Sequence, residues 1–235
     1  MASVIDPRAR IGAVHLTISS LDDSIRFYQA HLGFVVHRRE ERIAWLGAGG
    51  ADLLVLSACE RAPRARGTTG LYHFAVLVPT RADLARAFMR LVETDTLMQG
   101  DLASAASQSG AGLARETVIG HVHLHVSRLD EAQRFYVDVL GFELMQRYGP
   151  SALFVSAGGY HHHIGLNTWA GVGAPPAPPG AIGLRHFDVM LSDESARSAV
   201  EERLRAADVP IERTDEGLLV RDPAKNFVLL TVAAR

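Results

Sequence analysis

Hydrophobic and polar positions alternate along the chain in short runs, and segments with helical spacing separate these runs. Residues 11–18 place Val14 on one face and His15 on the other, as in a half-buried strand. Capping residues and then apolar residues at helical spacing predict a helix that ends at Gly33. Three apolar runs separated by turn residues predict an antiparallel meander, at 34–36, 43–46 and 52–56. The pattern therefore predicts one βαβββ unit.

The same pattern returns later in the chain at fixed offsets. His123 follows His15 by 108 residues, and the strand run 183–189 follows the run 70–76 by 113 residues. Fixed offsets at several landmarks indicate an internal duplication. The chain therefore contains four units, which we name modules A, B, A′ and B′ in chain order.

Module B is shorter than its later copy. Its strand is followed by a helix over 81–93 with Leu84, Phe88 and Leu91 on its apolar face, and then by a stretch rich in Ala and Ser. The predicted fold class is α+β, with tandem βαβββ modules that form open barrels in two pseudo-repeated halves. We expect an N-terminal half, a linker and a C-terminal half at residues 10–100, 101–117 and 118–235.

Composition narrows the functions to those of a packed globular protein. The chain is 48% hydrophobic and 21% charged, and its net charge of −2 gives no basic field for nucleic acid or anionic membranes. A single cysteine, Cys59, rules out an internal disulfide, and no apolar run reaches the roughly 18 residues of a membrane span. We expect a cytoplasmic protein with a small, weakly charged ligand.

Four histidines, His15, His73, His123 and His186, each lie in the first strand of a module, on the face away from the packed Val and Leu residues. If paired modules curl into a half-barrel, two such imidazoles converge inside it, and neutral imidazole is a good ligand for Fe, Zn and Ni. The alternative is that these histidines have only a structural role, with the hydrogen-bonding needs of their rings met at the core or surface. Their register with the duplication favours a metal site.

Several motifs together resemble the vicinal oxygen chelate superfamily of glyoxalases, bleomycin-resistance proteins and extradiol dioxygenases. They are Val-His-Leu, Arg-Phe-Tyr, Leu-Gly-Phe, Gly-Leu-x-His-Phe and Asp222-Pro223, and the run 160–167 is similar to the catechol dioxygenase branch. The resemblance implies a divalent metal, Fe(II) first and Mn(II) as the alternative, on two histidines and a glutamate. It implies His15 with His73 in one half and His123 with His186 in the other. It also implies that His162, between His161 and His163, acts as an acid and base.

The carboxylate ligand that the resemblance implies is missing from its usual place. Leu229 stands where the last strand of module B′ should carry a glutamate, and module B lacks the corresponding tract. Asp101 and Glu116 do not lie on patterned strands. Two explanations stay open: a degenerate homologue that holds no metal, or a segment that relatives contain near residues 100–117 and this sequence lacks.

These observations leave three hypotheses. The first is extradiol cleavage of a catechol-like aromatic with dioxygen. The second is a metal-free binding protein of the bleomycin-resistance type, and the third is a lyase or isomerase of the glyoxalase type. The sequence has no phosphate-binding loop, nucleophile elbow or paired cysteines. Assembly into a homo-oligomer is left open.

Overall fold

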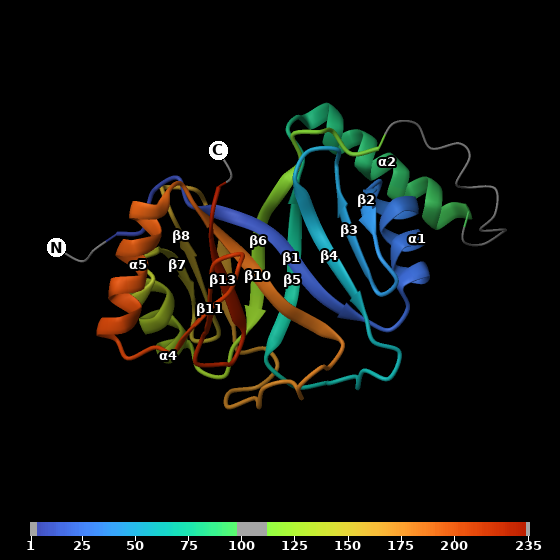
Figure 1. The fold of residues 1–235 in the computed structure, drawn as a ribbon. Helices are drawn as coiled ribbons and strands as arrows, with labels where there is room; N and C mark the ends of the chain where they lie inside the picture. Colours follow the sequence, from blue (N-terminus) through green and yellow to red (C-terminus); the bar gives the residue numbers. More distant parts are fainter. Residues whose placement is uncertain (1–3, 98–111, 234–235) are drawn as a thin grey trace.

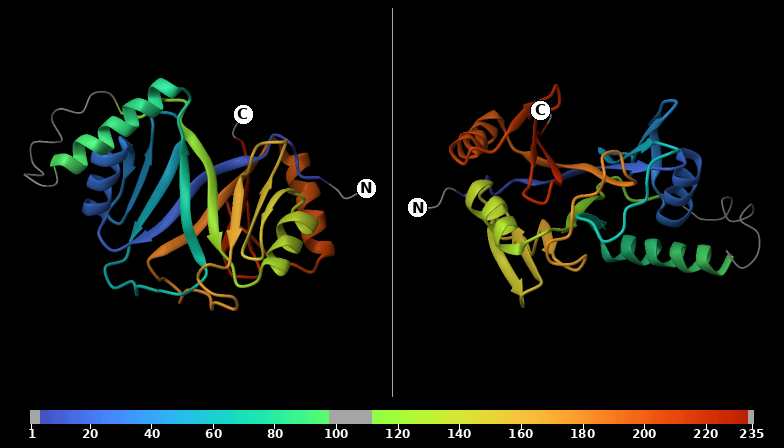
Figure 2. Two further views of the ribbon diagram at one scale, coloured as in Figure 1. Left: turned by 180° about the vertical axis from the view of Figure 1, so that it is seen from behind. Right: turned by 90° about the horizontal axis from the view of Figure 1, so that it is seen from below.

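The computed structural model describes residues 4–97 and 112–233, which form two open, twisted sheets flanked by helices (Figure 1). The elements in chain order are β1 Arg10–Ile18, α1 Leu21–Leu32, β2 Val35–Arg39, β3 Ile43–Gly47, β4 Asp52–Ala58, β5 Gly70–Leu77, α2 Arg81–Leu97, β6 Val118–His125, α4 Leu129–Gln133, the π-helical η1 Arg134–Val139, β7 Glu143–Tyr148, β8 Ala152–Ser156, β9 Ile164–Asn167, β10 Gly183–Leu191, α5 Glu194–Ala206, β11 Ile211–Arg213, β12 Leu218–Arg221 and β13 Phe227–Val232. Helices α1 and α2 lie at one end of the molecule and α4 and α5 at the other (Figures 1 and 2).

The predicted α+β class and the repeated modules are confirmed. Module A has the expected helix, whose N-terminus is capped by Ser20 and whose C-terminus is closed by Gly33 at a φ of 75°. Strands β2, β3 and β4 follow it as the predicted antiparallel meander. The predicted linker lies mostly outside the described residues.

The pairing of the modules crosses the two halves of the chain. One sheet has the strand order β11-β12-β13-β10-β1-β4-β3-β2, and the other has the order β5-β6-β9-β8-β7. Module A therefore pairs with B′ through β1 and β10, and module B pairs with A′ through β5 and β6. The expectation that His15 pairs with His73, and His123 with His186, is wrong. The first strands of all four modules have equivalent patterns, so the patterns do not determine which strands pair.

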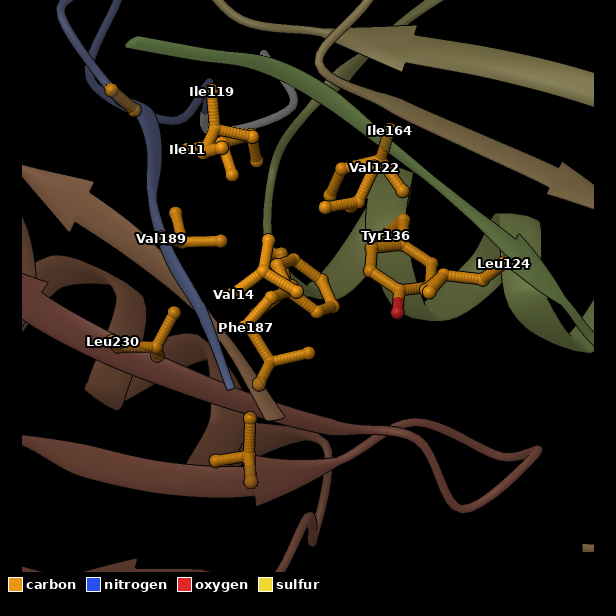
Figure 3. Close-up of a cluster of buried hydrophobic side chains, with 14 of the residues drawn as sticks. Ile11, Val14, Ile119, Val122, Leu124, Tyr136, Ile164, Phe187, Val189 and Leu230 are labelled. Carbon is orange, nitrogen blue, oxygen red and sulfur yellow. The ribbon is translucent and has the colours of Figure 1, made fainter. Parts of the chain in front are cut away.

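A continuous apolar core lies beneath both sheets. Val122 and Leu124 of β6 are fully buried on the face that packs toward Tyr136 of η1, and Val14 of β1 packs near Phe187 of β10 (Figure 3). Because side chains alternate along a strand, burying this face of β6 leaves the histidines of the strand on the opposite face. The core thus fixes which way the candidate site residues point.

Helix α2 of the short module B exposes the apolar face that the sequence predicts. Leu84, Phe88 and Leu91 are 60%, 62% and 41% exposed, whereas the polar residues Asp83 and Arg90 are buried. Strand β5 is the edge of its sheet, because no further strand of module B lies beside it in the described part of the chain. The apolar face of α2 is therefore largely uncovered in the described part of the chain. A complete module would place more strands there.

A buried polar network joins modules A′ and B′. Tyr136 Oη donates a hydrogen bond to Asp222 Oδ2 at 3.1 Å, and the Asn226 backbone and side-chain nitrogens donate to the same carboxyl at 2.8 and 3.0 Å. Asp222 is fully buried, and desolvation outweighs these hydrogen bonds and raises its pKa from 3.8 to about 6.

This network predicts a specific pH dependence of stability. Because the pKa of Asp222 is higher in the folded than in the unfolded protein, protonation of this carboxyl stabilises the folded state. This stabilisation is complete below about pH 4 and is lost as the pH rises through about 6. The variant Asp222→Asn lacks this carboxyl and therefore this pH dependence. We expect its free energy of unfolding, minus that of the wild type, to rise by about 3 kcal/mol over this range, because each unit of pKa difference corresponds to about 1.36 kcal/mol. Denaturant unfolding at a series of pH values measures this difference. The exposed Asp215→Asn is the control, and a pH-independent difference for Asp222→Asn would contradict the assignment.

Candidate metal centre

A β-bulge in β5 shapes the surface that the histidines occupy. Leu71 pairs with Leu124 and His73 pairs with His123, so Tyr72 is an extra residue on β5. Bulges re-aim side chains and are common next to functional sites. Here the Tyr72 ring lies on the same side as the histidines, with its centroid 5.4 Å from that of His123.

Five histidines meet on this side of the five-stranded sheet, and we call them the β6 histidine cluster: His73, His121, His123, His161 and His162. His73 Nε2 lies 3.0 Å from His121 Nε2, and the rings of His73 and His123 are 5.0 Å apart between centroids. The ligand atoms of His121, His161 and His162 all lie within 4.8 Å of one another. The structure thus brings together the predicted ligands His73 and His123 and the predicted acid and base, His162.

Burial favours the neutral form of four of these imidazoles, those of His73, His121, His123 and His162. Desolvation, followed by the charges of neighbouring histidines, lowers the pKa of His121 to about 3 and that of His123 to about 4. The pKa values of His73 and His162 are also lowered, mainly by desolvation. Neutral imidazoles have a free lone pair, which is the form that binds a metal ion.

The surroundings of His123 fit a metal ligand. Its Nε2 atom is buried and has no hydrogen-bond partner among the described residues. Gly165 of β9 lies beside it, and a Cβ atom at that position would be only 2.8 Å from the imidazole ring. The missing side chain therefore makes room for the ring. A buried nitrogen without a partner is costly unless something binds it, and a divalent cation would do so.

Aromatic side chains surround the same histidine. The ring centroids of Trp169 and Phe154 lie 5.3 and 5.6 Å from that of His123, and Tyr72 contacts Trp169 at 5.2 Å. Phe154 also lies 5.0 Å from His162. Aromatic faces and edges at these spacings bind flat aromatic rings favourably. The cluster thus combines nitrogen ligands with an aromatic wall.

His163 has a structural role instead. Its Nδ1 atom accepts a hydrogen bond from the Ala157 backbone nitrogen at 3.2 Å and lies 2.9 Å from Ser156 Oγ. It is buried, whereas His161 is exposed. Of the three consecutive histidines, His162 therefore has the best position for chemistry.

The other two predicted ligands, His15 and His186, lie in the eight-stranded sheet. They are register partners on β1 and β10, and their rings stack with centroids 3.8 Å apart. Asp188 lies beside them, and no pattern in the sequence marks it as a candidate ligand. Tyr72 and Trp169 are likewise not predicted, because bulges and loop positions leave no periodic pattern.

Comparison with known proteins identifies the family. The sequence model of the Glyoxalase/Bleomycin resistance protein/Dioxygenase superfamily matches residues 10–109 and 118–226. The chain belongs to this superfamily. It is 38% identical to a catechol-2,3-dioxygenase of Bacillus subtilis (strain 168), over 94% of this chain and 96% of the relative. This similarity supports a dioxygenase.

Solved structures share the fold of this chain at low identity. A Bacillus subtilis protein described provisionally as a dioxygenase has a TM-score of 0.67 at 11% identity, with 99% of this chain and 87% of that chain covered. Glyoxalase I from Zea mays has a TM-score of 0.59 at 16% identity, with coverages of 95% and 92%. None of the described helices combines the length and apolar character that crossing a bilayer requires.

The catechol-2,3-dioxygenase relative is longer than this chain, which is relevant to the shortness of module B. Its alignment extends over 277 positions, 42 more than the 235 residues of this chain, so the relative contains at least 42 residues without a counterpart here. This difference favours the explanation that a segment present in relatives is absent from this sequence. The suggested position of that segment, near residues 100–117, lies mostly outside the described residues.

The contact between Gly165 and His123 gives a test of the centre that does not depend on activity. We expect Gly165→Ala to displace the imidazole and weaken metal binding by roughly 10–100-fold, as loss of ligand orientation does. Calorimetric titration with Mn²⁺ measures the affinity, and circular dichroism checks the fold. In a His123→Ala background, Gly165→Ala should cause no further loss. Unchanged affinity of the single variant would exclude His123 as a ligand.

Proposed function

We propose that this protein is a metal-dependent dioxygenase that cleaves a catechol-like ring beside its two hydroxyls, at the β6 histidine cluster. The observation that carries the proposal is the convergence of His73, His121 and His123 with His162 and an aromatic wall. The catechol-2,3-dioxygenase relative supports the same reaction class. Fe(II) is the expected metal and Mn(II) the alternative.

Each group of side chains has a distinct task in this proposal. His123, with its unpartnered Nε2, and His73 would hold the metal, and His121 completes a set of nitrogen donors. When bound, the metal supplies positive charge that stabilises the substrate oxygens and orients them beside dioxygen. Trp169 and Tyr72 would stack on the substrate ring, and their aromatic edges keep water from one side of it.

His162 would hold and transfer a proton. Its ring centroid lies 4.3 Å from that of His121, and burial lowers its pKa, so it is neutral and can accept a proton from a substrate hydroxyl. A catechol oxygen binds a metal more strongly once its hydroxyl has lost the proton. A neutral base next to the site can accept that proton.

Metal content and product formation test this proposal together. We expect protein purified without oxygen to contain iron and to convert a catechol panel to coloured ring-fission products. We expect His123→Ala to lose both metal and product, because it removes a ligand. Elemental analysis measures the iron content, and absorbance measures the ring-fission products.

A metal-free binding protein is the second candidate, and one observation favours it. No carboxylate of a described residue forms an ion pair with a histidine of the cluster, although such pairs occur at His15, His37 and His186. Saturable binding of an aromatic without metal or ring-fission product would establish this candidate and contradict the dioxygenase.

The role of His162 can be separated from that of the ligands. We expect His162→Ala to keep its metal content and lose turnover by roughly 10²–10⁴-fold, the usual contribution of a general acid or base. His161→Ala is the matched control, because His161 is exposed and its ring lies farther from His121, at 6.3 Å. Loss of metal from His162→Ala would instead make His162 a ligand.

A further inference from the structure

The strand pair β1–β10 repeats the geometry of β5–β6 in the other sheet. His15 and His186 are register partners, as His73 and His123 are. The bulge is also repeated, because Leu16 pairs with Leu184 and leaves Arg185 as the extra residue, at the position that corresponds to Tyr72. The duplication has thus produced two copies of one site.

The two copies differ in the third group that faces the histidine pair. At the offset of 113, Asp188 of β10 corresponds to Ala75 of β5, and at the offset of 108, His121 of β6 corresponds to Ala13 of β1. One copy therefore has a carboxylate on one strand, while the other has an imidazole on the opposite strand. Each copy has three candidate donors from two strands.

The carboxylate of Asp188 lies between the two imidazoles. Its Oδ1 atom is 3.5 Å from His15 Nε2 and 3.8 Å from His186 Nε2, and the three ligand atoms all lie within 4.8 Å of one another. These separations are too long for hydrogen bonds. They exceed by less than about 1 Å the spacing of about 3 Å between neighbouring ligands of an octahedral ion with bonds near 2.1 Å, so a small inward movement of the side chains would bring them to that spacing.

Two of these atoms are buried and accept no hydrogen bond from a described residue. His186 Nε2 and Asp188 Oδ1 both lack a hydrogen bond within the described part of the chain. The two atoms lie 3.8 Å apart, so one cation bound between them would satisfy both. Leaving both unsatisfied would cost free energy on folding.

The position of Asp188 also accounts for Leu229. Strands β10 and β13 are parallel, and Asp188 is the register partner of Leu229. Register partners project their side chains to the same face of a sheet. The carboxylate missing at Leu229 is therefore present on the neighbouring strand.

We propose that His15, His186 and Asp188 form a second divalent metal site, which binds an ion of the Fe²⁺, Mn²⁺ or Co²⁺ type through two imidazoles and one carboxylate. His186 also lines a cavity of about 900 Å³, and Arg185, Arg221 and Lys225 are among the other lining residues. The cavity reaches one of the three proposed ligands, His186, and its cationic groups suit a small anionic ligand. This proposal does not depend on the proposed function, because it is tested by measuring the bound metal and not the enzymatic activity.

Titration with Co²⁺ tests the site, because Co²⁺ gives absorption bands that report its ligands. In a His73→Ala, His121→Ala, His123→Ala background, which removes the three proposed donors of the first centre and breaks the trio of His121, His161 and His162, we expect one equivalent of Co²⁺ to bind. Adding Asp188→Asn should abolish that equivalent. The exposed Asp215→Asn in the same background should leave it unchanged, and circular dichroism checks that each variant is folded.

A rescue variant keeps the test decisive even if Asp188→Asn perturbs packing. We expect Leu229→Glu to restore Co²⁺ binding in an Asp188→Ala background, because the two positions are neighbours on one face. If Asp188→Asn keeps its equivalent of Co²⁺, or if the background variant binds none, the second site does not exist. In that case, Asp188 serves only as an ion-pair partner of His15.

Discussion

The antiparallel pairing of the modules' first strands is the constraint on which the candidate chemistry depends. Pairing β5 with β6 places His73 beside His123, and pairing β1 with β10 places His15 beside His186. Burial of Val122 and Leu124 on the opposite face of β6 fixes the direction of the histidines. A shift of one residue in either register would turn these imidazoles into the core and separate the ligands.

The sequence was sufficient to predict the modules, because alternation, caps and offsets are local signals. It also identified His73, His123 and His162, which the structure brings together. It did not predict that modules pair across the halves, since their first strands have equivalent patterns. Asp188, Tyr72 and Trp169 were missed because bulges and strand register decide what they face, and neither leaves a mark on periodicity.

The short module B links the fold to the question of the carboxylate. Its helix α2 exposes Phe88 and Leu91, and its strand β5 is the edge of a sheet. The catechol-2,3-dioxygenase relative has at least 42 residues without a counterpart in this chain. The two duplicated sites have meanwhile acquired different third groups, His121 in one and Asp188 in the other. Duplication, followed by divergence of one position in each copy, accounts for the different third groups of the two sites.

The central claim is that the β6 histidine cluster holds the catalytic metal. Crystals loaded with Fe(II) without oxygen, measured at the iron absorption edge, test it directly. We expect an anomalous peak about 2.0–2.2 Å from His123 Nε2, at the usual metal–imidazole distance. A dioxygenase whose iron lies elsewhere, with no peak beside His123, would contradict it.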